Sequence, residues 1–250
     1  MIDREDKALA ELGRIHHPAG ALRLPPAEPT DTVEMVTGRV PVGRWDHELI
    51  ERIVASGTSV LDLGCGRGSL LHALRVKKGV RGQGVEKDPE KLIECVARGV
   101  PVIHGDLDAG LLGTFPRDAF DYVVLEMTLQ TVKNPRDIML EMLRVGRVGV
   151  VSFPNFGHWR VREQLLRDGR TPVTDTLPFR WYDTPNIRVL TIRDFEEFCE
   201  ANEVHVLDRY VLAGGRYRRM ASTDNVVAEE ALYIVCGAES LTEVADGGGI

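Results

Sequence analysis

Between residues 58 and 155, short apolar runs alternate with segments of helical spacing, and this alternation limits the fold more than any other feature of the chain. Five apolar runs have the length and the glycine or proline flanks of buried strands, namely 58–64, 80–87, 101–106, 120–126 and 148–155. Three segments between them have helical spacing, namely 69–76, 89–99 and 135–145. Strands that are apolar almost throughout are covered on both faces, which predicts a parallel sheet between two layers of helices.

The alternation of apolar runs and helical segments ends after Asn155. A helix is expected at 191–203, and two antiparallel strands at 204–213 and 230–238. Right-handed crossovers between the earlier strands give a doubly wound α/β fold with its ligand crevice beyond the carboxyl ends of the strands. We therefore expect a mostly parallel, seven-stranded sheet with a reversed final strand.

The composition of the chain ends differs from that of the middle. Residues 1–32 contain four prolines and lack a sustained apolar period, and 239–250 end in a glycine run, so both are expected to be flexible. A single domain is expected over 33–238, with an irregular, proline-punctuated insertion near 169–190.

Charge and composition exclude several classes of function. Lys and Arg number 31 against 38 Asp and Glu, and the net charge of -7 argues against binding to nucleic acid or to anionic membranes. No apolar run approaches the roughly 18 residues of a membrane span, and the first residues lack the apolar segment of a secretory signal. The four cysteines are far apart and form no C-x-x-C pair, so we expect a cytoplasmic protein with no metal site. Arginines lie near aromatic residues at 159–170 and 216–219, and we interpret both as solvated or partner-facing surfaces.

The most informative segment is LDLGCGRG at 61–68. Its glycines are spaced G-x-G-x-G, which differs from the G-x-G-x-x-G of dinucleotide folds and disfavours an NAD or nucleotide-sugar enzyme. Asp62 lies directly before this turn, where a carboxylate repels phosphate but attracts an ammonium or sulfonium group. The turn therefore favours a cationic, nucleoside-containing ligand.

Two further acids follow the next two strands. Glu86 comes 24 positions after Asp62, close to the offset of about 20 residues at which an acid reaches a ribose diol. Asp106 follows the third strand in HGDLD. Since the carboxyl ends of parallel strands meet at one edge of the sheet, the three carboxylates are expected to face one crevice.

These motifs resemble a known superfamily. DLGCGRG, VEKDP, GDLD and FDYVVLEMTLQ look like those of class I S-adenosylmethionine (SAM)-dependent methyltransferases, with a match over about 60–154. A closer resemblance is to the MetW family of methionine-biosynthesis proteins, carried over about 60–203 by SFPNFGHWRVREQLL and LPFRWYDTPNIRVLTIRDFEEFC as well.

The resemblance implies roles for individual residues. It implies Asp62 near the methionine ammonium, Glu86 on the ribose hydroxyls, and Asp106 with Leu107 around the adenine of SAM or S-adenosylhomocysteine. The residues predicted to bind this cofactor are Asp62, Gly64, Cys65, Gly66, Gly68, Glu86, Lys87, Asp106, Leu107 and Glu126. The resemblance also implies homoserine O-acyltransferase as a partner whose activity the protein supports.

Candidates for catalysis are less specific. Glu126 and His158 are each a possible general base, but Glu126 could equally complete the cofactor pocket and His158 could pack the start of a helix onto the sheet. Trp181 and Tyr182 suit either a lid over the ligand or a protein-binding loop. Cys65 is interpreted as a small buried filler that faces the cofactor.

Two functions remain open from the sequence. The first is a SAM-binding, methyltransferase-like protein that supports the acyltransferase, and the second is a catalytic methyltransferase acting on a small molecule. The oligomeric state does not follow from the sequence.

Overall fold

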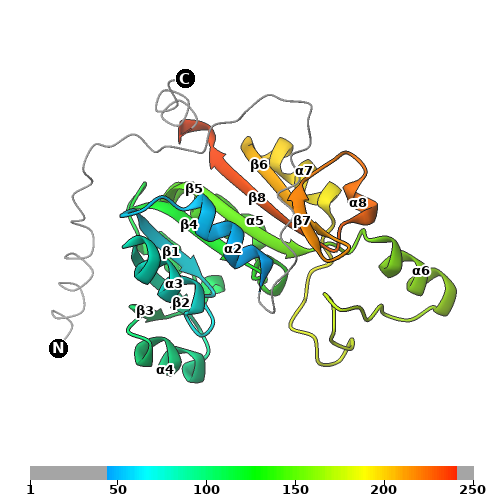
Figure 1. Ribbon diagram of the computed structural model, residues 1–250, viewed down its shortest axis with the longest axis horizontal. Coiled ribbons are helices and arrows are strands. Elements are labelled where there is room, and N and C mark those ends of the chain that lie inside the picture. Colours follow the sequence, from blue (N-terminus) through cyan, green and yellow to red (C-terminus); the bar gives the residue numbers. More distant parts are fainter. Residues whose placement is uncertain (1–43, 241–250) are drawn as a thin grey trace.

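The computed structural model describes residues 44–240 and arranges them around one eight-stranded sheet of order β3-β2-β1-β4-β5-β8-β6-β7 (Figure 1). The expected extension at 1–32, the first residues of the expected domain and most of the expected tail lie outside the described residues. Among those described, no helix combines the length and the apolar character that crossing a membrane would require.

The five strands expected from the alternating pattern all form, and they pair in parallel. They are β1 (Ser59–Leu63), β2 (Arg81–Glu86), β3 (Val102–His104), β4 (Phe120–Glu126) and β5 (Gly146–Pro154). The reversed final strand is also confirmed: β8 (Glu230–Gly237) lies antiparallel between β5 and β6 (Val204–Ala213). The doubly wound, mostly parallel α/β fold expected from the sequence is therefore correct.

The expected number of seven strands is too small by one. A short strand, β7 (Arg216–Arg219), pairs antiparallel with β6 at the outer edge of the sheet. Gly214 and Gly215, with φ of 58° and 73°, form the two-residue turn between them. A Gly-Gly pair is a typical hairpin turn, but an arginine-rich run of four residues has little strand character of its own.

Helices cover both faces of the sheet, namely α2 (Trp45–Ile53), α3 (Ser69–Lys78), α4 (Pro89–Ala97), α5 (Pro135–Val145) and α7 (Ile192–Ala201) (Figure 1). The helix α6 (Trp159–Asp168) stands away from the sheet, and a short helix, α8 (Asp224–Val227), precedes β8. The start of α4 follows from its sequence: the Asp88 carboxylate accepts a 2.9 Å hydrogen bond from the Glu90 amide, and Pro89 occupies the first turn.

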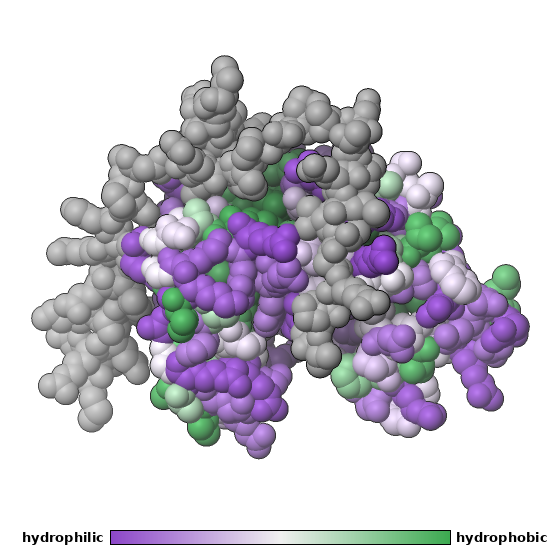
Figure 2. Space-filling view, in the orientation of Figure 1, coloured by the Kyte–Doolittle hydropathy of each residue, from purple (hydrophilic) through white to green (hydrophobic). Residues whose placement is uncertain are grey.

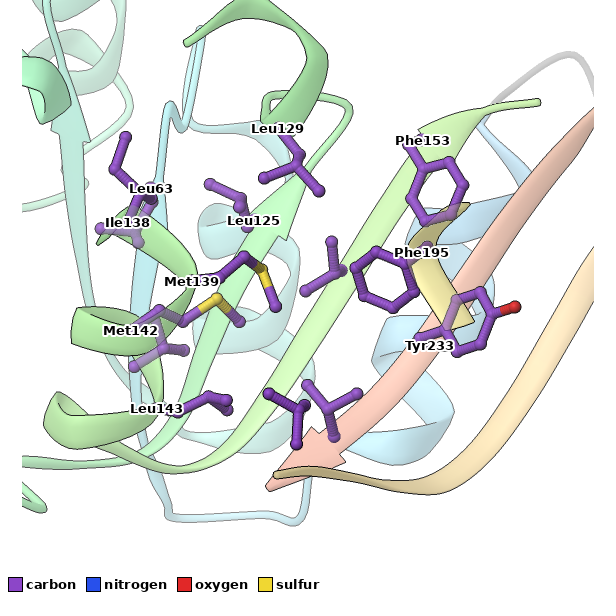
Figure 3. Packing of buried hydrophobic residues seen from close by; sticks show 14 of the residues in the cluster. Leu63, Leu125, Leu129, Ile138, Met139, Met142, Leu143, Phe153, Phe195 and Tyr233 are labelled. Atoms are coloured by element: carbon purple, nitrogen blue, oxygen red, sulfur yellow. The ribbon is translucent and has the colours of Figure 1, made fainter. Parts of the chain in front are cut away.

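Side chains that alternate along the strands divide the core in two. Val123 and Leu125 of β4 point into a cluster with α5 and α7, whereas Tyr122 and Val124 point into a cluster with α2 and α3. In the first cluster, methionines of α5 pack beside Leu125, and Phe195 of α7 lies between Phe153 and Tyr233 (Figure 3). This packing holds β1, β2 and β4 in register, so that their carboxyl ends share one edge.

Candidate functional site

A cavity of about 660 Å³ opens at the carboxyl ends of the parallel strands. Of the residues predicted to bind a cofactor, those that line it are Gly64, Gly66, Glu86, Lys87, Asp106, Leu107 and Glu126. Thr184, Pro185 and Ile187 of the irregular segment close another side of it. The fold therefore brings together most of the predicted set, from the ends of β1, β2, β3 and β4.

The glycine turn after β1 has the backbone shape that only glycine adopts without strain. Gly64 and Gly66 have φ of 79° and 55°, in the left-handed region. A methyl group on Gly64 would lie 2.6 Å from Oγ1 of Thr128, whereas one on Gly66 would meet no atom within 4 Å. The two glycines thus serve different ends: Gly64 permits close packing of the turn on the loop after β4, and Gly66 leaves backbone open at the cavity.

Glu86 holds this turn in place. One carboxylate oxygen accepts a 2.9 Å hydrogen bond from the amide of Gly66, and the other accepts from the amides of Lys87 and Asp88, each at 2.9 Å. The side chain is only 6% exposed. Because each carboxylate oxygen has two lone pairs, Glu86 retains acceptor capacity toward the cavity after these bonds are made.

Asp106 and Asp108 shape the floor beyond β3. Asp106 accepts a 3.0 Å hydrogen bond from the amide of Asp108 and caps a short 3-10 helix, Leu107–Ala109. Asp108 in turn accepts from the amides of Lys133 and Asn134, which ties this loop to the one before α5. Leu107 is buried at this junction and lines the cavity as an apolar residue.

Asp62 is buried at the end of β1 and does not itself line the cavity. Its carboxylate has no hydrogen-bond partner among the described residues, and it is 2% exposed. Burial, reinforced by the nearby Glu126 carboxylate, raises the pKa of Asp62 to about 8. The site therefore contains a carboxyl group that a cation placed beside it would ionise.

Sequence reasoning missed a group of charged residues that surrounds Glu126. His47 Nε2 lies 2.9 Å from one carboxylate oxygen of Glu126, and the Arg44 guanidinium lies 3.5 Å from the other. The same guanidinium forms a 2.8 Å ion pair with Asp46. Arg44, Asp46 and His47 are close together in the string RWDHE at the start of α2, and this cluster of charged residues could have drawn attention to them. Nothing in the sequence, however, indicated that this helix packs over β4.

Protonation in this group follows from burial. The pKa of Glu126 is raised well above its ordinary value, mainly by burial and then by the Asp46 charge, and burial raises the pKa of Glu230 to about 7. Burial lowers the pKa of His47, although the nearby Asp46 charge acts to raise it. Asp46, His47 and Glu126 lie close enough to share a metal ion, but the Arg44 guanidinium already supplies a positive charge to both carboxylates.

Besides Asp62, two residues that were predicted to bind the cofactor, Cys65 and Gly68, do not line the cavity. The Cys65 side chain, expected to face the cofactor, packs under Gly84 and lies 3.9 Å from the sulfur of Cys95, in the cluster beneath α3. Burial raises its pKa, so the thiol is a filler. Gly68 starts α3 and faces Cys95 and Val100.

His158 belongs to another part of the molecule. It precedes α6 at the end of the loop after β5, is 5% exposed, and is not a lining residue of the cavity. Its ring packs near Trp159 and its pKa is lowered by burial. This geometry matches the alternative in which the histidine packs the start of a helix; Trp159, by contrast, is 44% exposed.

Comparison with known proteins gives a consistent result. The family model described as "Methionine biosynthesis protein MetW" matches residues 44–235. A bifunctional methionine biosynthesis protein MetXA/MetW of Rhodopirellula baltica is 43% identical over 161 residues, which cover 61% of this chain and 26% of that protein. A ribosomal protein L11 methyltransferase of Burkholderia vietnamiensis is 34% identical over 107 residues, 43% of this chain and 34% of the relative. The chain thus spans only about a quarter to a third of these relatives.

The fold is also that of solved methyltransferases. A SAM-dependent methyltransferase of Thermotoga maritima, described as a possible histamine N-methyltransferase, aligns with a TM-score of 0.55 at 13% identity, covering 76% of this chain and 86% of that one. At this identity the similarity establishes the Rossmann-like methyltransferase fold and nothing finer.

Proposed function

Because the chain belongs to the MetW family of methionine-biosynthesis proteins, we propose that it binds SAM or S-adenosylhomocysteine and docks on homoserine O-acyltransferase to support that enzyme. The cavity is the observation that supports the binding of SAM or S-adenosylhomocysteine. A glycine turn with open backbone and a carboxylate positioned by backbone amides line it, and the buried Asp62 carboxyl group, which has no hydrogen-bond partner within residues 44–240, lies behind the same turn.

The residues at the cavity fit this ligand by their chemistry. Within the part of the chain that the structure describes, the buried Asp62 carboxyl group lacks the hydrogen bonds that such groups normally make, and an ammonium or sulfonium group would compensate it. Glu86 has spare acceptor capacity for ribose hydroxyls, and Leu107 offers an apolar surface for a base. When bound, SAM would supply an activated methyl group.

The second part rests on the family and on its fused relative. The Rhodopirellula baltica protein carries the names MetXA and MetW on one chain. Fusion raises the effective concentration of two modules that work together, so it supports a partnership between this chain and a separate acyltransferase.

Two measurements test the proposal. Calorimetric titration with SAM and with S-adenosylhomocysteine should give a saturable heat, and size exclusion with homoserine O-acyltransferase should give co-elution together with higher acyl-transfer activity. Absence of heat would contradict the ligand assignment. Absence of both co-elution and activation would contradict the partner assignment.

One observation favours methyl transfer by the chain itself. Glu126 lines the cavity, with His47 2.9 Å from one carboxylate oxygen and the Arg44 guanidinium 3.5 Å from the other, which is the arrangement of a general base held by neighbouring residues. We expect a catalytic protein to form S-adenosylhomocysteine from SAM in the presence of small-molecule extracts, and Glu126→Gln to abolish that turnover while retaining SAM binding. A lack of turnover with every extract would leave the partner role as the function.

A further inference from the structure

Residues 159–189 form an arm, made of α6 and the irregular chain after it, that exposes large apolar side chains. Those at least two-fifths exposed are Trp159, Leu165, Leu166, Val173, Phe179, Trp181, Tyr182, Ile187 and Val189. Leu166 is 90% exposed, Trp181 73% and Tyr182 64%. In Figure 1 this arm stands away from the sheet, and Figure 2 shows hydrophobic and hydrophilic residues mixed over that part of the surface.

The arm has a defined shape despite its lack of strands. The side-chain amide of Gln164 donates to the carbonyl of Val173 at 3.1 Å and accepts from its amide at 3.0 Å, which fixes the chain against α6. The amide of Arg180 donates to the Asp183 carboxylate at 2.7 Å and so closes a turn with Trp181 and Tyr182 at its tip. The two rings pack edge to face with centroids 5.6 Å apart.

The end of the arm is anchored to the body. The amides of Ile187 and Arg188 donate to the carbonyl of Gln130 at 2.9 and 3.0 Å, beside the cavity that Ile187 lines. The tip therefore projects from a fixed base. Pre-ordered aromatic side chains lose little entropy when they dock on a partner, which is why such residues dominate binding energies.

The charge of the arm differs from that of the chain. Residues 159–189 contain six arginines and four acids, whereas the whole chain carries -7. Among the described residues, no carboxylate pairs with the side chains of Arg162, Arg170 or Arg180, and the Arg160 guanidinium lies over the Trp159 ring. Arginine, tryptophan and tyrosine are the residues most enriched at the energetic centres of protein interfaces.

We infer that this arm is the docking surface for homoserine O-acyltransferase, and that it meets a face of the enzyme with an apolar hollow for Trp181 and Tyr182 and an acidic rim for the arginines. This inference rests on the proposed function and adds to it the surface and the chemistry of the partner's face. A second copy of the chain is a poorer occupant, because a two-fold interface centred on the arm would bring its arginines close to their own symmetry copies, where like charges repel.

The test compares two double variants of the full chain. Trp181→Ala/Tyr182→Ala removes the tip, and Ile93→Ala/Val96→Ala removes two comparably exposed apolar side chains of α4, 66% and 62% exposed, far from the arm in sequence. The tip variant should bind the acyltransferase at least tenfold more weakly than wild type, with unchanged melting temperature and SAM affinity. The α4 variant should bind as wild type does.

Charge is tested separately with Arg162→Glu/Arg170→Glu. We expect slower association with the acyltransferase and a weaker dependence on salt. If wild type binds the enzyme and the tip variant binds equally well, the docking assignment is wrong while the partnership stands. If wild type does not bind, the partnership itself is wrong. If the tip variant instead converts a wild-type dimer into monomer in sedimentation runs, the arm is a self-association surface and the inference is overturned.

Discussion

The carboxylate of Glu86 accepts a hydrogen bond of 2.9 Å from the backbone amide of Gly66 and thereby joins the end of β2 to the glycine turn after β1. Its second oxygen binds two more amides, those of Lys87 and Asp88. One side chain thus sets the shape of both backbone segments on this side of the cavity.

Replacement of Glu86 by alanine should therefore affect stability as well as binding. Leaving even one of these amides without a partner costs about 1–3 kcal/mol of unfolding free energy. We expect chemical denaturation to show a loss of at least that size, and calorimetry to show SAM affinity more than tenfold weaker. Glu90→Ala, at an exposed position four residues further on, is the control and should change neither quantity appreciably. A Glu86→Ala variant with the stability and the SAM affinity of wild type would refute the role of this carboxylate.

The stability of the ligand-free chain should depend on the ionisation of Asp62. Its pKa is about 8 when folded, against about 3.9 in an unfolded chain. The protonated form is favoured by folding, so this contribution is complete below about pH 4 and is lost as the pH rises toward 8. Asp62→Asn should flatten that decline and be more stable than wild type at pH 8.5 but not at pH 4. Urea midpoints measured across this range check the prediction; Glu126 and Glu230, whose pKa values are also raised, account for any residual slope.

The affinity for SAM should rise with pH over the same interval. A bound cation favours the ionised form of Asp62, so binding below pH 8 must release a proton. We expect the dissociation constant to fall between pH 6 and 8, by less than tenfold per pH unit. The other titratable or charged neighbours of the group are Glu126, His47, Arg44 and Glu86. Titrations in two buffers of different ionisation enthalpy should report the proton directly, and Asp62→Asn should release less. Proton uptake in place of release would contradict the assignment.

Two glycines of the turn should respond differently to alanine. In Gly64→Ala the new methyl group meets Thr128 at 2.6 Å, so the loop must shift and the melting temperature should drop by several degrees. In Gly66→Ala the methyl group enters open space, and only the left-handed backbone costs about 1–2 kcal/mol. We therefore expect the Gly66 variant to lose proportionately more SAM affinity than stability. Thermal melts and calorimetry of both variants test this expectation. If the loss of SAM affinity relative to the loss of stability is the same in both variants, the distinct role of Gly66 is contradicted.

Much of the fold could be predicted from the sequence because the five parallel strands are short, apolar and separated by strong capping signals such as Asp88 and Pro89. The cavity could be predicted as well, since the ends of parallel strands meet by topology. The contribution of α2 could not: Arg44, Asp46 and His47 reach Glu126 only because Trp45, Leu49 and Ile50 pack on the sheet beside β4, and no local pattern specifies that docking. The orientation of Cys65 likewise depends on the absence of a side chain at Gly84, on a different strand.

The short strand β7 has a consequence for the chain in a crowded solution. An open sheet edge can template pairing with further sheets, and here the outermost strand carries Arg216, Arg218 and Arg219. Arg218 and Arg219 form ion pairs with Asp224 and Asp208, whereas Arg216 lies exposed on that border. A very short edge strand with an exposed guanidinium group is a poor template for a further strand, so this hairpin disfavours edge-to-edge aggregation.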